Sequence, residues 1–137
     1  MASFGTHSQT QLSTCHPKLQ LVLNEAIKYF DFTIQEGFRN QADQHKAFLE
    51  GNSKLDWPNG NHNQNPSRAA DCYPYPIDFS DNTKNLQRFC VLAGVIHTAA
   101  QLVGVKIRWG GDWNQNWDMR DEPNFRDLPH FELAKDE

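Results

Sequence analysis

The sequence has few cysteines, no cluster of basic residues and no long uninterrupted apolar run. Its three cysteines, Cys15, Cys72 and Cys90, are widely spaced and form no C-x-x-C pair, which argues against a zinc ribbon or a thiol redox motif. We therefore expect reduced, partly buried thiols. The formal net charge of −4 argues against a general nucleic-acid surface, although it leaves a local basic patch open.

The start of the chain and its apolar stretches bear on location. The apolar stretches are far shorter than the ~20 residues of a membrane helix, so we expect no stable membrane association. The first residues, MASFGTHSQTQL, lack the basic segment and apolar core of a secretory signal, so we expect the protein to be made in, and at first to stay in, the cytoplasm. With 137 residues, 38% of them hydrophobic, the chain suits one globular domain, residues 1–137.

Three segments have the apolar spacing of amphipathic helices. Residues 17–30 carry apolar side chains three and four positions apart, with Pro17 in the first turn. Asn40 can cap a second helix that Gly51 closes. The longest helix is predicted over residues 83–104, with Gly104 as its cap.

Short alternating segments between these helices predict strands, at residues 32–37, 69–73, 105–109 and 130–133. Two long polar loops, residues 51–67 and 110–129, separate them, and loops of that length in a compact domain usually carry function. Helices and strands mix without a regular βαβ rhythm, so the predicted class is α+β.

The segment NHNQNPSRAADCYPYPIDF, residues 61–79, combines a histidine on a loop with an aspartate in an apolar run. His62 and Asp71 cannot hold a metal ion alone, and His130 is the candidate third ligand because it also lies where a loop meets a strand. Two imidazoles and one carboxylate form a typical catalytic zinc set, which leaves a fourth position for water. The pattern gives no ligand role to the other histidines, His7, His16, His45 and His97.

Hydrolysis at such a site also needs a base, and two carboxylates lie near His130 in the sequence. Asp127 is three residues earlier, on the loop, and Glu132 is two residues later, on the same face of a strand as His130. The spacing alone leaves both open as the base.

The residues around these candidates resemble one known group of enzymes. The stretch His62-Asn63-x-x-Pro66-Ser67-Arg68-Ala69-x-Asp71, followed by Tyr73-Pro74-Tyr75-Pro76, is similar to the zinc-binding segment of the LAS metallopeptidases. These are D-Ala-D-Ala carboxypeptidases, vancomycin-resistance dipeptidases and phage L-alanyl-D-glutamate endopeptidases, and the form here resembles the small phage endolysins. The segments FTIQEGFRNQADQHKAFLEGNSK, RWGGDWNQNWD and DLPHFEL resemble further parts of the group in the same order, so the resemblance runs from about Pro17 to Leu133.

The resemblance implies a fold and a metal site. The fold would be a small antiparallel sheet flanked by about three helices, as in hedgehog and D-Ala-D-Ala peptidase domains. His62, Asp71 and His130 would bind Zn²⁺.

The same resemblance implies the catalytic roles. Asp127 would be the general base, and Arg39 would hold the scissile carbonyl and stabilise its developing negative charge. Arg39 and Ser67 would contact the substrate, and Glu132 would support the site without being the base.

The expected activity is zinc-dependent hydrolysis of peptidoglycan stem peptides at the L-Ala-D-Glu bond. A D-Ala-D-Ala carboxypeptidase or dipeptidase is the alternative, and a non-catalytic zinc-containing binding domain of the same fold is an alternative of another class. The expected partner is bacterial peptidoglycan, reached by a monomer after release from the host bacterial cytoplasm, for which phage enzymes use a holin.

The sequence departs from the group at three places. Gly60 stands where a serine is often found, His62 and Asp71 are nine rather than seven residues apart, and Ala70 replaces a larger aliphatic residue. These departures bear on substrate preference more than on the metal site.

Several residues have competing interpretations. Arg39 also suits a surface ion pair with Glu36, which would contribute little. Trp109 is expected in the core, and Trp113 and Trp117 are either core residues or a wall of the site. The loop carboxylates suit either a solvated acidic surface or a Ca²⁺ site; they are Asp112, Asp118, Asp121 and Glu122.

Overall fold

The computed structural model describes residues 2–121 and 126–137, and it combines helices with a small antiparallel sheet, as predicted. The α-helices are α1 (Thr6–Ser13), α2 (Pro17–Ala26), α3 (Gln41–Leu49) and α4 (Asn82–Val103). The strands are β1 (Phe32–Glu36), β2 (Ala69–Pro74), β3 (Ile107–Trp109) and β4 (His130–Leu133). Two short 3-10 helices are η1 (Asn61–Asn63) and η2 (Met119–Asp121).

The sheet brings together residues that are far apart in the sequence. Its strands lie in the order β1-β2-β4-β3, and each neighbouring pair is antiparallel. This register places Glu36, Asp71 and His130 in one row across β1, β2 and β4. Because side chains alternate between the faces of a strand, the neighbouring Ala70 and Phe131 enter the core while Asp71 and His130 face the other way.

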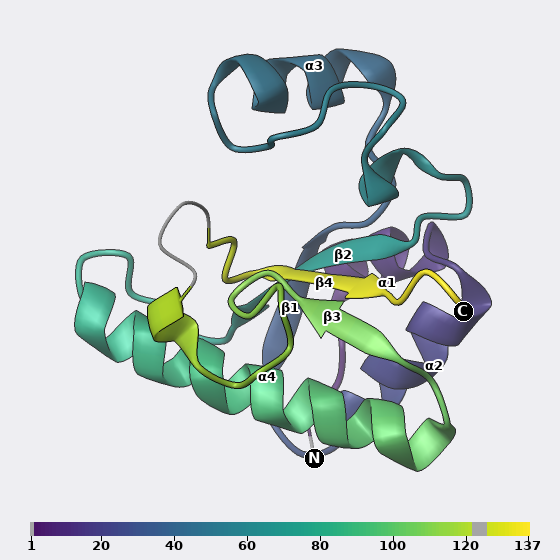
Figure 1. Ribbon diagram of the computed structural model, residues 1–137. Helices are drawn as coiled ribbons and strands as arrows, with labels where there is room; N and C mark the ends of the chain where they lie inside the picture. Colours follow the sequence, from purple (N-terminus) through teal and green to yellow (C-terminus); the bar gives the residue numbers. More distant parts are fainter. Residues whose placement is uncertain (1, 122–125) are drawn as a thin grey trace.

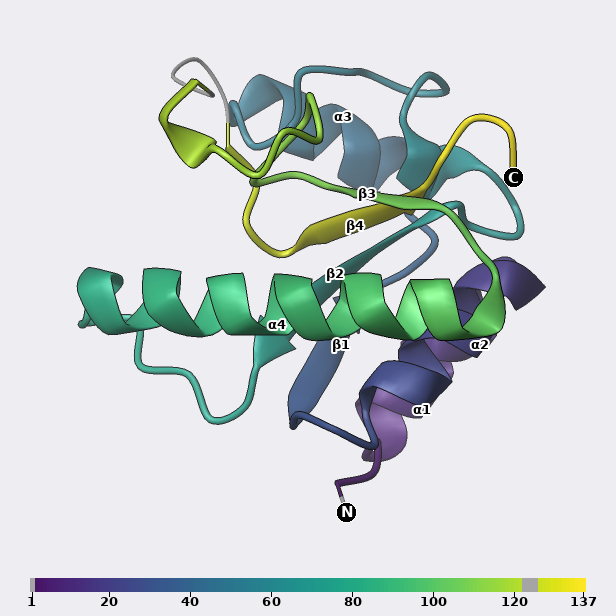
Figure 2. The same ribbon diagram turned by 60° about the horizontal axis from the view of Figure 1, so that its bottom comes forward.

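The two faces of the sheet have different coverings. α2 and α4 pack against each other and against one face, whereas α3 lies over the other face (Figure 1 and Figure 2). The core lies on the α4 side, to which α4 contributes Phe89, Leu92, Ala93, Ile96, Ala99 and Ala100. The side of the sheet that faces α3 is therefore available for polar side chains.

α4 matches the helix predicted over residues 83–104 to within one residue at each end. Its apolar residues are spread along the whole helix and are not gathered in one uninterrupted run. Within the described residues, it is the one helix that is long and apolar enough to cross a membrane, a criterion that core helices also meet. It begins at Asn82, capped by the side chain of Asp81, and ends at Val103. Gly104 follows as the predicted cap, and its φ of 75° is the left-handed conformation expected there.

α1 was not predicted, because its segment THSQTQLS has no apolar stripe. Its polar side chains instead bond to the outer edge of β1 and the residues after it. Oγ of Ser8 accepts from the N–H of Ile34, and Oε1 of Gln11 accepts from the N–H of Gly37. α1 therefore closes the sheet edge through side-chain hydrogen bonds.

Other expectations hold with small shifts. α2 ends at Ala26, earlier than the predicted residue 30, and Asn40 caps α3 by accepting from the N–H of Asp43. All three cysteines are free, with Cys15 and Cys72 buried and Cys90 exposed.

Candidate metal centre and cleft

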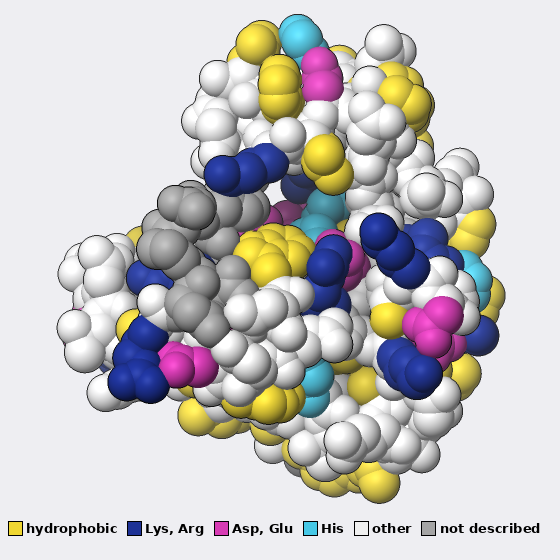
Figure 3. All heavy atoms as spheres, viewed as in Figure 1, with side chains coloured by type: hydrophobic (Ala, Val, Ile, Leu, Met, Phe, Trp, Pro, Cys, Tyr) yellow, Lys and Arg dark blue, Asp and Glu magenta, His cyan; other side chains and the backbone are white. Residues whose placement is uncertain are grey.

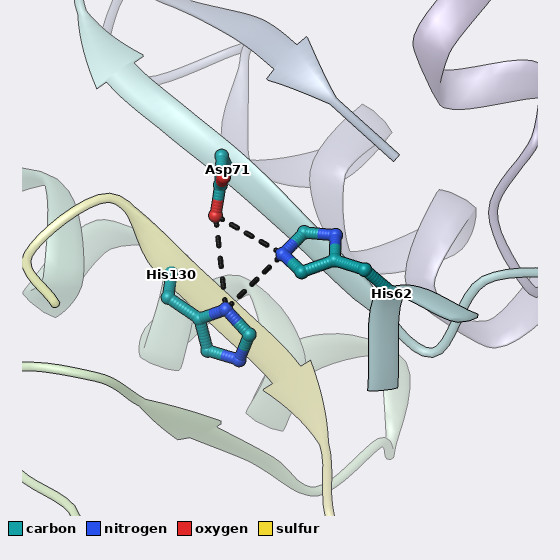
Figure 4. Close-up of side chains that lie close together, drawn as sticks. All are labelled: His62, Asp71 and His130. Carbon is teal, nitrogen blue, oxygen red and sulfur yellow. Dashed lines mark hydrogen bonds and ion pairs between the residues drawn. The ribbon is translucent and has the colours of Figure 1, made fainter. Parts of the chain in front are cut away.

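Three side chains from different elements point toward one another where η1 meets β2 and β4 (Figure 4). Nε2 of His62 lies 3.2 Å from Oδ1 of Asp71 and 3.2 Å from Nδ1 of His130. Nδ1 of His130 lies 3.7 Å from the same Asp71 oxygen. Ligand atoms about 2.0 Å from a tetrahedral metal ion lie about 3.3 Å apart, so these three atoms have suitable spacing for one ion.

Each imidazole is oriented by a second partner on its far side. The carbonyl oxygen of Gly37 accepts from Nδ1 of His62 at 2.7 Å, and Oε1 of Glu132 accepts from Nε2 of His130 at 2.7 Å. When the rings are neutral, these bonds leave the lone pairs of the other two nitrogens facing Asp71. This is the second layer of contacts that metal-binding histidines generally have.

The charges of the cluster favour a cation at its centre. Burial would lower the pKa of His130, but Asp71 and Glu132 raise it to about 9. Burial would raise the pKa of Asp71, but His62 and His130 hold it well below its ordinary value. Without metal the cluster therefore retains a proton, and a metal ion would take over that positive charge.

Glu132 lies behind His130, away from the three converging atoms. Its second oxygen accepts from Arg108 at 2.8 Å, and the ring of Trp113 lies 5.5 Å from that of His130 and 5.2 Å from the Arg108 guanidinium. Burial would raise the pKa of Glu132, but His130 and Arg108 lower it to about 2. Sequence spacing left Asp127 and Glu132 as candidates for the base. Of these, Glu132 bonds to the ring nitrogen of His130 that points away from the metal cluster, so it orients that ring.

Asp127 lies on the open side of the cluster. Its Oδ2 is 3.9 Å from Nδ1 of His130, and its side chain is 27% exposed. Its backbone N–H donates to Gly110 and its carbonyl accepts from the N–H of His130. A Cβ on Gly110 would overlap the carbonyl of Asp127, so this close approach requires glycine. Burial and the nearby Asp71 raise the pKa of Asp127 to about 6.

Arg39 follows β1 and reaches the metal-binding carboxylate. Nε donates to Glu36 at 2.6 Å, one terminal nitrogen donates to Gln44 at 3.0 Å, and the other donates to Oδ2 of Asp71 at 3.4 Å. The side chain is only 12% exposed. The pair with Glu36 therefore exists, but it lies beside the candidate metal centre rather than on an open surface.

A cleft of about 670 Å³ opens over these groups, between α3 and residues 126–129. Figure 3 shows the hollow, with histidine and acidic side chains visible inside it. The lining residues include Glu36, Arg39, Asp43, Lys46, Asp71, Tyr73, Arg126 and Asp127. The cleft therefore brings Asp71 of the metal cluster together with Asp127 and Arg39 in one space.

Both the sequence and the fold of this chain resemble those of known proteins. Residues 1–134 match the family described as phage L-alanyl-D-glutamate peptidase. This chain belongs to that family. The L-alanyl-D-glutamate peptidase of Escherichia phage T5 is 34% identical over 124 residues, which cover 87% of each chain. The crystal structure of the L-Ala D-Glu endopeptidase ChiX from Serratia marcescens matches with a TM-score of 0.74 and 25% identity, over 96% of this chain and 90% of that one.

The phage peptidase family was therefore correctly inferred from the sequence segments around the candidate site. The structural match to ChiX confirms the expected α+β fold.

Ser67 does not fit the predicted substrate contact. It is fully buried, and its hydroxyl bonds to the backbone of Ala69 at 2.7 Å. Its own backbone bonds to Thr14 and His16, so it ties the α1–α2 junction to the start of β2. A side chain in this position supports the strand that carries Asp71, and it is not among the residues that line the cleft.

Within the part of the loop whose side chains the structure describes, nothing supports a calcium site. The carboxylate of Asp112 is buried and accepts from the backbone N–H groups of Asn116 and Trp117, and Asp118 pairs with Arg120. Glu122 lies outside the described residues. The carboxylates of Asp112 and Asp118 therefore serve the loop itself.

The three tryptophans in and after β3 have different environments. Trp109 is buried in the core, as expected, and its indole N–H donates to the carbonyl of Leu128 at 2.6 Å. Trp113 lies against His130, and the largely exposed Trp117 packs on His97. Trp113 is thus the tryptophan that contacts the metal cluster.

Several residues of the site were not singled out in the sequence. Arg108 was detectable in principle, because alternation along VKIRW places it opposite the buried Ile107 and Trp109. Gln44 lies on the predicted second helix, but nothing in the helix pattern indicates that this polar residue is buried.

Proposed function

We propose that this chain is a zinc endopeptidase that cleaves the L-Ala-D-Glu bond of bacterial peptidoglycan stem peptides. The observation that carries the proposal is the convergence of His62, Asp71 and His130 beside a cleft that Asp71, Asp127 and Arg39 line. Family membership supports this bond over D-Ala-D-Ala. A cleft with a base and a cation beside the metal ligands also favours an enzyme over a binding domain.

His62, Asp71 and His130 would hold the metal through two nitrogens and one oxygen, a donor set typical of catalytic zinc. When bound, Zn²⁺ acidifies water and polarises a carbonyl oxygen. Gly37 and Glu132 keep the two imidazoles turned toward the ion. Three protein ligands leave room for the reacting groups on the cleft side.

Asp127 acts as the general base. It removes a proton from the attacking water and returns it to the nitrogen of the departing amine, so the carboxylate is regenerated in each turnover. In the protein without metal, burial and Asp71 raise the pKa of Asp127 to about 6, which makes it more basic than an ordinary carboxylate.

Arg39 binds the carbonyl oxygen of the scissile bond. Its guanidinium is permanently charged, and its donors have a fixed geometry that Glu36, Gln44 and Asp71 orient. Negative charge builds on the carbonyl oxygen as water attacks, so the attraction to Arg39 is greatest in the transition state.

The cleft also suits an anionic peptide. In the cell wall, D-Glu is joined onward through its γ-carboxyl group, so its α-carboxylate lies next to the scissile amide. Lys46 on α3 and Arg126 on the opposite wall both line the cleft, and either cation can attract this carboxylate.

We further propose that residues 1–137 form one peptidase domain, since a single core cluster extends from Phe4 to Leu133. The protein would work as a monomer on the wall of the host bacterium, after release from the cytoplasm with the help of a holin.

The test is mass spectrometry of purified peptidoglycan after digestion. The proposal predicts glycan strands whose stems end in L-Ala and free peptides that begin with D-Glu. A chelator should abolish the cleavage and added Zn²⁺ should restore it. Release of D-Ala alone would support the carboxypeptidase alternative, and wall binding without new amino groups would support a binding domain.

A further inference from the structure

α3 is attached to the rest of the protein in an unusual way. Most helices are held by an apolar stripe, but the only buried residue among the described residues of α3 is Gln44, which is 1% exposed. The apolar Phe48 and Leu49 of this helix are exposed. α3 nevertheless forms one wall of the cleft through Asp43 and Lys46. A buried amide, rather than a hydrophobic contact, thus secures this wall.

The amide of Gln44 is fully used. Its oxygen accepts from Arg39 and from Nδ2 of Asn63, each at 3.0 Å. Its nitrogen donates to Oγ of Ser53 at 3.0 Å and to the carbonyl of Leu55 at 2.5 Å. Two donors on one side and two acceptors on the other define a single orientation of the amide.

These bonds connect α3 to the catalytic side of the cleft. Asn63 follows His62 in η1, and its Nδ2 also donates to the carbonyl of Arg39. Gln44 therefore contacts the guanidinium of Arg39 directly and the backbone of Arg39 through Asn63. Both contacts come from one side chain whose own hydrogen bonds go to Arg39, Asn63, Ser53 and Leu55 and not to the three metal-ligand candidates.

From this geometry we propose that Gln44 is a positioning residue that holds the Arg39 guanidinium in its catalytic orientation. The inference rests on the proposed function of Arg39. Glu36 and Asp71 already place two carboxylates on this guanidinium. A neutral acceptor on the third side fixes the orientation without further neutralising the charge that must meet the carbonyl oxygen.

A double-mutant cycle between Gln44→Met and Arg39→Met tests the proposal. Methionine keeps the length and volume of glutamine but lacks its hydrogen bonds. Gln41→Ala is the matched control, because Gln41 is an exposed glutamine on the same helix. Steady-state kinetics use a defined stem peptide, and zinc content and melting temperature are measured for each variant. The cycle is evaluated on kcat, because α3 is a wall of the cleft and KM also reports substrate contact with that wall.

Gln44→Met should retain zinc and lower kcat about 10- to 100-fold, since a displacement of about 1 Å at a catalytic group has effects of this size. In the Arg39→Met background the same change should alter kcat by less than about twofold. Gln41→Ala should match the wild type. An equal loss in both backgrounds, or a wild-type kcat for Gln44→Met, overturns the proposal.

Ser53→Ala provides a second route if Gln44→Met does not fold. It removes one of the two acceptors that hold the Gln44 amide, and it lies outside the metal cluster. Its smaller loss of kcat should likewise disappear in the Arg39→Met background, and a loss that persists there counts against the proposal. Failure of the proposed function would be visible separately, as a wild-type protein that cleaves no stem peptide.

Discussion

The two sides of the cleft are built by different means. On the sheet side, Asp71 and His130 are opposite residues on paired strands whose neighbours Ala70 and Phe131 are fully buried. On the helix side, α3 depends on the amide of Gln44. Strand register and core packing therefore fix the metal ligands Asp71 and His130, whereas hydrogen bonds fix the wall and Arg39. Changes on the sheet side should remove the metal, and changes on the helix side should leave the metal but weaken catalysis.

The largest effect is expected from the metal ligands. His62→Ala or His130→Ala should abolish both bound zinc and hydrolysis, because two remaining ligands hold zinc poorly. Elemental analysis beside a peptidoglycan digestion assay provides the measurement. His97→Ala is a suitable control, since His97 bonds to the Ala93 carbonyl within α4. Full zinc in a His62→Ala, His130→Ala double variant would show that the metal binds elsewhere.

Substitution of Asp127 should separate the loss of the general base from the loss of the metal. Asp127→Ala is expected to keep zinc and the fold while kcat falls about 100- to 10,000-fold, because the attacking water loses its proton acceptor. Glu132→Gln is the contrasting variant and should weaken zinc affinity by about 10- to 100-fold, because it alters the partner of His130. If Glu132→Gln loses turnover at full zinc occupancy while Asp127→Ala stays active, the two roles are reversed.

Arg39 should affect the transition state more than substrate binding. Arg39→Met is expected to raise the barrier by about 3 to 4 kcal/mol, mainly through kcat, and Arg39→Lys should recover part of the loss through its charge. Steady-state kinetics at measured zinc content is the test. An unchanged kcat in Arg39→Met would reduce Arg39 to a structural partner of Glu36.

Metal binding should depend on pH through His130. Its pKa of about 9 without metal means that zinc must displace a proton below that pH. Apparent affinity should therefore rise as pH increases toward 9 and level off above it. Calorimetry at pH 7 in buffers of different ionisation enthalpy should detect about one proton released per zinc. A zinc affinity that stays constant over about one pH unit on either side of pH 7 would contradict the coupling between zinc binding and deprotonation of His130.

The smallest effect concerns the wall itself. Amide hydrogens of α3 should exchange faster than those of β2 and β4, because α3 buries one side chain whereas both strands lie in the core sheet. Asn40→Ala should increase this exchange further by removing the cap, at a local cost of about 1 kcal/mol. Hydrogen-exchange mass spectrometry measures both, and equal protection of α3 and the strands would remove the contrast between the two sides.

The sequence predicted elements with local signals better than elements held by contacts between distant residues. Alternation in FTIQE and HFEL, together with the caps Asn40 and Gly104, located strands and helices correctly because these signals are local. α1 escaped detection because its contacts with β1 are polar side-chain bonds, which leave no apolar period.

The candidate site shows the same limit. The metal-ligand candidates were found because their residue types and the resemblance agree, and the structure brings them together. For Ser67, the motif does not reveal that its hydroxyl is buried and bonded to the backbone of Ala69. The contact between Gln44 and Arg39 depends on how α3 is placed over the sheet, and composition carries no signal for that.

Stoichiometric reconstitution tests the central claim most directly. Metal-free protein is titrated with Zn²⁺ while cleavage of the L-Ala-D-Glu bond in purified peptidoglycan is followed by mass spectrometry. We predict that cleavage rises in proportion to zinc, saturates at one ion per chain, and is absent throughout the titration of His62→Ala. Cleavage of this bond by the metal-free protein, or zinc-dependent cleavage by His62→Ala equal to the wild type, would contradict the account.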